Sequence, residues 1–376
     1  MHDWNIWLTR WAEAGLVDAD TATRIRSYEQ RHASSSKLRW PVLVASAFGA
    51  LMLGGGVLLF VAAHWDALSP TVRFLLVLTL VGGFHVAGAF FGERSPGLSS
   101  ALHAVGTVAL GAGIGLAGQI FNLDEHWPSG VLLWAVGAGA AWFVLRQAPQ
   151  AALLATLVPA WLLAEWSDVL RATDDARAIR VSAAGVFLLA LTYFTLVREP
   201  RKEGWQRALF WLGGVTVLPA AILLAAAAER GWWRGDSLLL QKPALAVIGW
   251  GAALGLPLAL AVAVRRLDAW PHAVAAVWTL GTLVVEQALG DVAVFVWWAI
   301  GAVGLVAWGV GEGRGERVNM GAAVFAATVV AFYFSQVMDK LGRSASLVGF
   351  GLLFLAGGWA LERVRRRLVE QARGAA

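Results

Sequence analysis

Long apolar segments separated by short polar connections recur from Pro41 almost to the C-terminus. A helix needs about 20 mostly apolar residues to cross roughly 30 Å of hydrocarbon, and each segment is close to that length. The pattern therefore predicts an all-α transmembrane helix bundle. We count about twelve spans, at roughly 41–63, 71–92, 102–121, 130–145, 148–166, 180–197, 208–228, 243–264, 272–289, 292–310, 318–335 and 344–361.

The first 36 residues have a different pattern, which predicts a short helical hairpin. Trp4, Leu8 and Trp11 recur at helical spacing, Gly15 interrupts the pattern, and Asp18 stands where the N-cap of a second helix would be. Such a hairpin can pack on the bundle or lie in the headgroup layer with its tryptophans toward the lipid. Alternatively, residues 1–33 form a docking surface for a cytosolic protein.

The chain is thus expected to have three parts: the hairpin and linker at 1–36, the bundle at 37–364 and a basic cytosolic tail at 365–376. With twelve spans, 21 of the 30 Lys and Arg residues fall on the side of the membrane that holds both termini. Cytoplasmic loops carry an excess of these residues, so both termini are predicted to be cytoplasmic. The polar start of the chain makes a cleaved signal peptide unexpected.

Composition supports membrane residence and limits the chemistry. Hydrophobic residues make up 58% of the chain and charged residues 15%, and the mean hydropathy is +0.63. The net charge of +5 is spread over short loops and termini, so topology explains it and no nucleic-acid partner is expected. The absence of cysteine excludes disulfides, thiolate nucleophiles and cysteine-ligated metals.

The segment from Gly106 to Trp127 combines a glycine-dense apolar helix with a polar end. Gly111, Gly115 and Gly118 fall on one helical face, where missing side chains allow neighbouring helices to approach closely. We therefore expect these glycines to mediate helix packing at the centre of the bundle.

Polar residues recur where odd-numbered spans end, on the side predicted to be non-cytoplasmic. Glu165 and Glu286 are the leading functional candidates, because a carboxylate is disfavoured in the last turn of a helix and is costly in lipid. The alternative is that both reach the interfacial water. The candidate residues of a substrate-binding vestibule are His64, Asp66, Gln119, Asp124, Glu165, Glu286, Gln287 and Gln336.

The aspartates that follow these spans have a structural explanation as well. Each precedes the next helix and can cap its free backbone N–H groups, as Asp291 is expected to do before Val292. Capping is the preferred interpretation for the aspartates as a group, Asp168 included.

No motif indicates a reaction. His85 and His103 can approach one another, but a lone histidine in an apolar helix is more often a packing residue than part of a metal site or proton relay. Phosphate-binding loops, metalloprotease helices and nucleophile elbows are absent from the sequence, and the glycine run lacks the preceding strand of a dinucleotide site. We expect no catalytic residue, no metal and no cofactor.

Three segments of the N-terminal half carry a resemblance to a known family: Trp7 to Val17, Gly54 to Asp66 with His64 and Trp65, and Gly115 to Phe121 with Gln119, followed by Asp124. Over roughly residues 1–170 the chain resembles domain-of-unknown-function family 2157, predicted bacterial membrane proteins with several spans. The resemblance implies a protein of the bacterial inner membrane and no particular activity.

Three functions remain open. The first is a carrier or flippase-like protein with a polar vestibule at the outer face, favoured by the span number and the polar groups at one membrane face. The second is a non-transporting scaffold or sensor that binds a cytosolic partner through its hairpin. The third is an envelope enzyme acting on a lipid-linked substrate, which the short loop after the first span disfavours. The oligomeric state is left open.

Overall fold

The computed structural model describes residues 4–36, 68–120, 126–170, 176–197, 203–228 and 238–337, with short pieces between 348 and 363. Side chains are described at most of these positions and not at 4–7, 29–36, 119–120, 176, 238, 286–287 or 337. The chain divides into two compact units, Met1–Arg73 and Phe74–Ala376, and each is described by itself.

The first unit contains the predicted helical hairpin. Helix α1 (Trp4–Glu13) packs against helix α2 (Ala19–Ser36), and Gly15 turns the chain between them with a φ of 69°. Asp18 Oδ1 accepts a hydrogen bond of 2.8 Å from the backbone N–H of Thr21. This bond lowers the pKa of the Asp18 carboxyl. The predicted cap is therefore confirmed.

Few of the hairpin's described apolar side chains are buried. Leu8 and Ala22 are buried, whereas Trp11, Leu16 and Tyr28 are exposed. Exposed apolar groups of this kind suit either a headgroup layer or a partner protein. The cytosolic partner stays a prediction.

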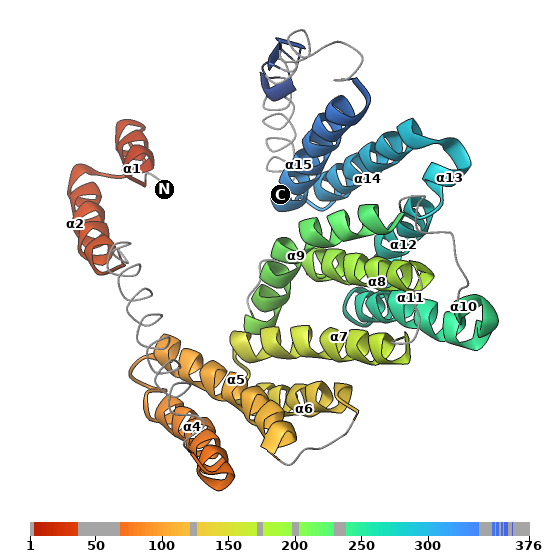
Figure 1. Cartoon of the computed structure of the whole chain (residues 1–376). Coiled ribbons are helices and arrows are strands. Elements are labelled where there is room, and N and C mark those ends of the chain that lie inside the picture. Colours follow the sequence, from red (N-terminus) through yellow and green to blue (C-terminus); the bar gives the residue numbers. More distant parts are fainter. Residues whose placement is uncertain are drawn as a thin grey trace. The chain divides into compact units, whose positions relative to one another are not determined.

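Every regular element among the described residues is a helix, which confirms the all-α class (Figure 1). Several helices begin at a proline, which has no N–H to leave unpaired in the first turn. After the hairpin these elements are α4 (Pro70–Phe90), α5 (Pro96–Ile120), α6 (Pro128–Leu145), α7 (Ala148–Leu170), α8 (Ala176–Thr195), α9 (Gly204–Ala228), α10 (Leu238–Gln241), α11 (Pro243–Arg265), η3 (Arg266–Ala269), α12 (Trp270–Thr282), α13 (Val285–Leu289), α14 (Asp291–Gly311), α15 (Gly315–Phe332) and η4 (Tyr333–Val337).

Within the described ranges, 9 segments are long and apolar enough to cross a membrane. They correspond to the predicted second to eleventh spans, with the eighth and ninth joined in one stretch, Pro243–Thr282. The predicted first span lies outside the described residues, and so does most of the twelfth. The total of twelve is therefore not confirmed and stays a prediction.

The joined stretch is not one straight helix. Helix α11 ends at Arg265, Arg266 has a φ of 54°, and η3 leads into α12. Helix α12 has 13 residues and rises only about 20 Å, too short to cross the hydrocarbon alone. The continuous span predicted at 272–289 is therefore wrong, because the helix ends at Thr282 and α13 is a separate piece of 5 residues.

Helix α8 occupies the centre of the second unit, and it packs against both α9 and α11 (Figure 1). In its most apolar 18-residue stretch, 72% of the residues are buried, compared with 22% in the corresponding stretch of α5. The expectation that the segment from Gly106 to Trp127 forms the centre is therefore wrong for the described helices. Spacing of glycines reveals where a helix can be approached closely, not how many neighbours surround it.

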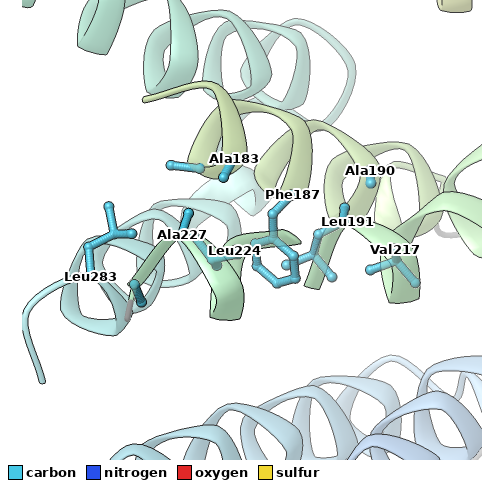
Figure 2. Packing of buried hydrophobic residues seen from close by; sticks show 11 residues of the cluster. Ala183, Phe187, Ala190, Leu191, Val217, Leu224, Ala227 and Leu283 are labelled. Carbon is cyan, nitrogen blue, oxygen red and sulfur yellow. The ribbon is translucent and has the colours of Figure 1, made fainter. Parts of the chain in front are cut away.

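The largest apolar core forms between α8 and α9. Phe187 and Leu191 of α8 face Val217 and Leu224 of α9, and Leu283 closes one end of the same cluster (Figure 2). Alanines fill the remaining positions, so the two helices approach closely.

Two tryptophans join α12 to α14 by a reciprocal arrangement. The Trp297 ring lies over Gly281, and the Trp278 ring lies over Gly301. Each indole N–H donates a hydrogen bond of 3.1 Å to the backbone carbonyl of the other tryptophan. An unpaired indole N–H would be costly in hydrocarbon, and a helical carbonyl has a second lone pair to offer. The glycines let the rings lie flat on the partner helix.

A similar contact joins α5 to α6. The Trp134 ring lies over Gly111, and its N–H donates a bond of 2.8 Å to the Thr107 carbonyl. A Cβ added at Gly115 or Gly118 would meet no described atom within 4 Å. The packing role of these two glycines stays a prediction.

The tryptophan contacts predict a sharp difference between two glycines. Replacing Gly281 with alanine places a Cβ 2.3 Å from the Trp297 ring, and we expect a loss of about 1–3 kcal/mol from the overpacking. The same change at Gly304, where no atom lies within 4 Å, should be neutral or stabilise by about 0.5–1 kcal/mol. Thermal unfolding in detergent measures both. Equal melting temperatures for the two variants would contradict the packing.

Candidate functional site

Three charged side chains lie buried together where α11 and α14 end and α15 begins. The two carboxylate oxygens of Glu312 accept hydrogen bonds from the guanidinium groups of Arg265 and Arg317. The exposed fractions of the side chains are 9% for Glu312, 2% for Arg265 and 3% for Arg317. Hydrogen bonds of this kind offset the desolvation cost of a buried ion pair; of the Arg265 guanidinium, the buried Nε is left without a hydrogen-bond partner. We call these residues the Arg265–Glu312–Arg317 cluster.

The cluster also binds the C-terminus of α8. The Thr195 carbonyl accepts bonds of 2.7 Å from Arg265 and 2.8 Å from Arg317. The last carbonyls of a helix lack partners within it and carry partial negative charge, so cations are favourable there. The cluster therefore ties the central helix to the ends of α11 and α14 and the start of α15. We call this end of the second unit the Arg265 end.

Aromatic groups complete the cluster. The Trp308 N–H donates a bond of 2.8 Å to Glu312, and the guanidinium carbons of Arg265 and Arg317 lie 5.6 and 4.9 Å from the Trp308 ring centre. The ring of His272 meets the same tryptophan edge-on at 4.9 Å. Cation–π attraction is strong for a desolvated arginine over an indole.

The acid of the cluster stays ionised at neutral pH. Burial alone would raise the pKa of the Glu312 carboxyl, but the Trp308 N–H and the guanidinium groups of Arg317 and Arg265 outweigh burial, so its pKa lies below the usual value. The pKa of the Glu312 carboxyl in the unfolded chain is near 4.5, and the pairing stabilises the fold at any pH above that value. This stabilisation is lost as the pH falls through the lower pKa that the carboxyl has in the folded protein.

A cavity of about 560 Å³ adjoins the cluster, between α8, α9, α12, α14 and α15. Glu312 and Asp268 line it at the Arg265 end, and Trp278, Trp298 and Phe187 line it farther in. From Trp298 to Glu312 it follows α14 for about 20 Å, at 1.5 Å per residue. Its volume lies within the range of about 300–1,000 Å³ that is typical of ligand sites.

The wall of the cavity is mostly apolar and is open at the side. Trp270, Val274 and Ile300 line it and are all more than half exposed. These residues belong to two stretches, Pro243–Thr282 and Asp291–Gly311, that are long and apolar enough to cross a membrane. The opening is therefore bordered by apolar side chains, which suit an apolar or amphipathic molecule.

The predicted candidate Glu165 belongs to a second polar group, at the opposite end of the second unit. Its Oε2 lies 2.7 Å from His126 Nε2, and its Oε1 accepts a bond of 2.8 Å from Trp161. His126 Nδ1 lies 3.1 Å from Asp168. The imidazole is thus held between two carboxylates of α7, in a partly exposed position. Glu165 faces protein groups, as a carboxylate near hydrocarbon requires.

Only Glu165 and Gln336 of the predicted vestibule residues have described side chains, so the grouping of the whole set stays a prediction. His64, Asp66 and Asp124 lie outside the described residues. Gln119 lies on α5 and Gln336 on η4. Of the predicted residues whose side chains are described, neither Glu165 nor Gln336 lines the cavity.

Glu286 and Gln287 lie in α13, where only their backbone is described. Glu286 was expected in the last turn of a spanning helix, and this is wrong because α13 has 5 residues. The turn that separates α13 from α12 removes the unfavourable helix dipole on which that expectation relied.

Two aspartates do not have the capping role expected of them. Gly290, not Asp291, is the N-cap of α14, and Asp291 is the first helical residue, where the positive end of the helix favours it. Asp168 lies inside α7 and contacts His126. In both cases the helix boundary differs by a few residues from the predicted one.

The histidines of α4 and α5 meet as the sequence suggested. The Nδ1 atoms of His85 and His103 lie 3.0 Å apart, so one of them carries the shared hydrogen. His85 lies over Gly106, and His103 lies over Gly88. The pair is a packing contact between two helices. Among the described residues no group of three or more His, Cys, Asp or Glu side chains could hold a metal ion.

Sequence reasoning missed the Arg265–Glu312–Arg317 cluster, because it counted the two arginines only as loop charges that set topology and did not consider Glu312. One local signal was present: Trp308 and Glu312 are four residues apart, which is the spacing of neighbours on a helix. Which loops meet in space could not be read from the chain. The three segments are predicted to lie on the same membrane face, and their contact agrees with that.

Comparison with known proteins finds a likeness in the N-terminal part. Residues 9–151 match the family model described as Predicted membrane protein (DUF2157). This confirms the resemblance drawn from the sequence. No curated protein and no solved structure matches the chain. Together with the apolar helices, the match places the chain among membrane proteins with several spans. The cluster and the cavity lie beyond the matched residues.

The His126 contacts predict a pH-dependent stability. The hydrogen bond with Glu165 raises the pKa of His126; burial opposes this, and the charges of Glu165 and Asp168 reinforce it. The protonated imidazole stabilises the fold, and this stabilisation is fully present below about pH 6.5, the pKa of histidine in the unfolded chain. It is lost as the pH rises through the higher pKa that His126 has in the folded protein. The Glu165→Gln variant should therefore melt below the wild type at about pH 5, with a difference that shrinks by about pH 9. A difference that grows with pH would contradict the contact.

Proposed function

We propose that the chain is a carrier-like or flippase-like protein of the bacterial inner membrane, with both termini in the cytoplasm, that takes up an amphipathic molecule. The cavity beside the Arg265–Glu312–Arg317 cluster is the observation that carries this proposal. A scaffold needs no such cavity. Its apolar wall argues against a small polar solute, which would lose its hydration without gaining hydrogen bonds.

The ligand site of this proposal differs from the vestibule expected from the sequence. The cavity opens near the Arg265 end, which the charge pattern predicts to be cytoplasmic, and extends about 20 Å along α14 toward the other face. Glu165 and His126 lie at that other face. A carrier needs a binding site that reaches well into the membrane, and the length of the cavity satisfies this.

Transport of labelled lipids in proteoliposomes tests the proposal. The Gly304→Leu variant fills the cavity, since nothing lies within 4 Å of a Cβ at this cavity-lining position. We expect this variant to slow lipid translocation roughly tenfold, which corresponds to an increase of about 1.4 kcal/mol in the free-energy barrier to translocation. Gly255→Leu is the matched control, because Gly255 is an exposed glycine of α11 with equally open space around its Cβ.

Equal rates for Gly304→Leu and the wild type would contradict the proposal, provided that both variants melt like the wild type. The proposal would also be contradicted if proteoliposomes with the wild type translocated no substrate faster than protein-free liposomes do. The substrates tested would be neutral, zwitterionic and anionic lipids and soluble solutes.

A further inference from the structure

Three helices that pack against α8 contain a proline in mid-helix, whereas α8 itself contains none. Pro159 lies inside α7, Pro219 inside α9 and Pro257 inside α11. Each helix continues past its proline, and α8 contacts all three. Counted at 1.5 Å per residue from the Arg265 end, the prolines lie roughly 12–22 Å along their helices, in the middle of the spans.

A proline inside a helix leaves one backbone carbonyl without its partner. Proline has no N–H for the carbonyl four residues earlier, and its ring pushes that carbonyl aside. The carbonyls affected are those of Ala155 in α7, Val215 in α9 and Ala253 in α11. A carbonyl without a partner is costly within hydrocarbon, so neighbouring groups have to bond it or cover it.

Helix α8 meets two of these three positions. The Tyr193 hydroxyl donates a hydrogen bond of 3.0 Å to the Ala155 carbonyl, and Tyr193 is buried. Gly185 packs against Ala253, since a Cβ added to this glycine would lie 3.1 Å from the Ala253 Cα. The central helix therefore contacts α7 and α11 where each of them lacks a backbone hydrogen bond.

We propose that α7 is hinged at Pro159 and that the Tyr193 hydroxyl is its latch, which holds α7 in the observed form through the bond to Ala155. A helix bends most easily where its ladder of backbone hydrogen bonds is interrupted, and Pro159 interrupts the ladder of α7. The hinge follows from the packing alone, and its purpose rests on the proposed function, because a carrier alternates between two conformations.

The two halves of α7 are held by different partners, as a hinge requires. Before the proline, Ala148 meets Gly204 at the start of α9. After the proline, the Trp166 ring lies over Gly249 of α11, and the Trp166 N–H donates a hydrogen bond to the Ala178 carbonyl of α8. A bend between the halves would therefore shift the first half together with the start of α9, a helix that lines the cavity.

Spin-label distances across the hinge test the latch. The chain has no cysteine, so Val144→Cys and Val169→Cys provide the only attachment sites. Both positions are exposed, one shortly before the start of α7 and the other in its last turn. In lipid nanodiscs the wild type should give one main distance. Tyr193→Phe should populate a second distance roughly fivefold more than the wild type does, because one hydrogen bond is lost.

Two further substitutions locate the effect. Pro159→Ala restores an N–H for the Ala155 carbonyl, so it should narrow the distance distribution, and adding Tyr193→Phe to it should have no effect. Thr156→Val is the matched control, because the Thr156 hydroxyl bonds to the Ala152 carbonyl of its own helix. This control should give the wild-type distances.

Identical distance distributions for Tyr193→Phe and the wild type would overturn the latch. A second distance that persists after Pro159→Ala would overturn the hinge. So would a Pro159→Ala distribution as broad as that of the wild type, and this comparison holds even if Tyr193→Phe does not fold.

Transport separates the hinge from the proposed function. Pro159→Ala should slow lipid translocation, and an unchanged rate would overturn the purpose assigned to the hinge. Two distances in Tyr193→Phe without translocation by the wild type would leave the hinge standing and remove the proposed function. Translocation by a wild type whose α7 keeps one distance in every variant would do the reverse.

Discussion

A charge buried away from water must be paired, and the Arg265–Glu312–Arg317 cluster is where this requirement organises the second unit. The desolvation cost of each ion is several kcal/mol, so removing one partner is far more costly than the pair is stabilising. Because the same guanidinium groups also bind the Thr195 carbonyl, the ends of α8, α11, α14 and α15 are fixed together. The cluster thus holds together one end of the central helix α8 and three helices that contribute to its surroundings.

The same rule explains the tryptophans inside the spans. Trp278 and Trp297 satisfy their N–H groups on carbonyls of the opposite helix, and Gly281 and Gly301 make room for the rings. Gly304 lies one turn beyond Gly301 on α14, and no ring covers it. Gly301 and Gly304 both line the cavity, so the helix contact and the proposed ligand site share the same glycine-containing face of α14.

Segment length and apolar content predicted the helices well, including the interruption after Arg265 and the Asp18 cap, because both depend on nearby residues. The position of α8 at the centre could not be predicted, since burial is decided by which helices are neighbours. Trp166 shows the same limit. Its ring lies over Gly249 and its N–H donates to the Ala178 carbonyl, and neither neighbour could be identified from the sequence.

A double-mutant cycle on Glu312 and Arg317 tests the central claim most directly. Glu312→Gln, Arg317→Gln and the double variant would be compared by their free energies of unfolding in detergent. If the two side chains share a buried ion pair, the double variant should lose less than the sum of the single losses, by about 1–3 kcal/mol. Losses that add within about 0.5 kcal/mol would show that the pair does not exist, and would contradict the account of how the helix ends are held together.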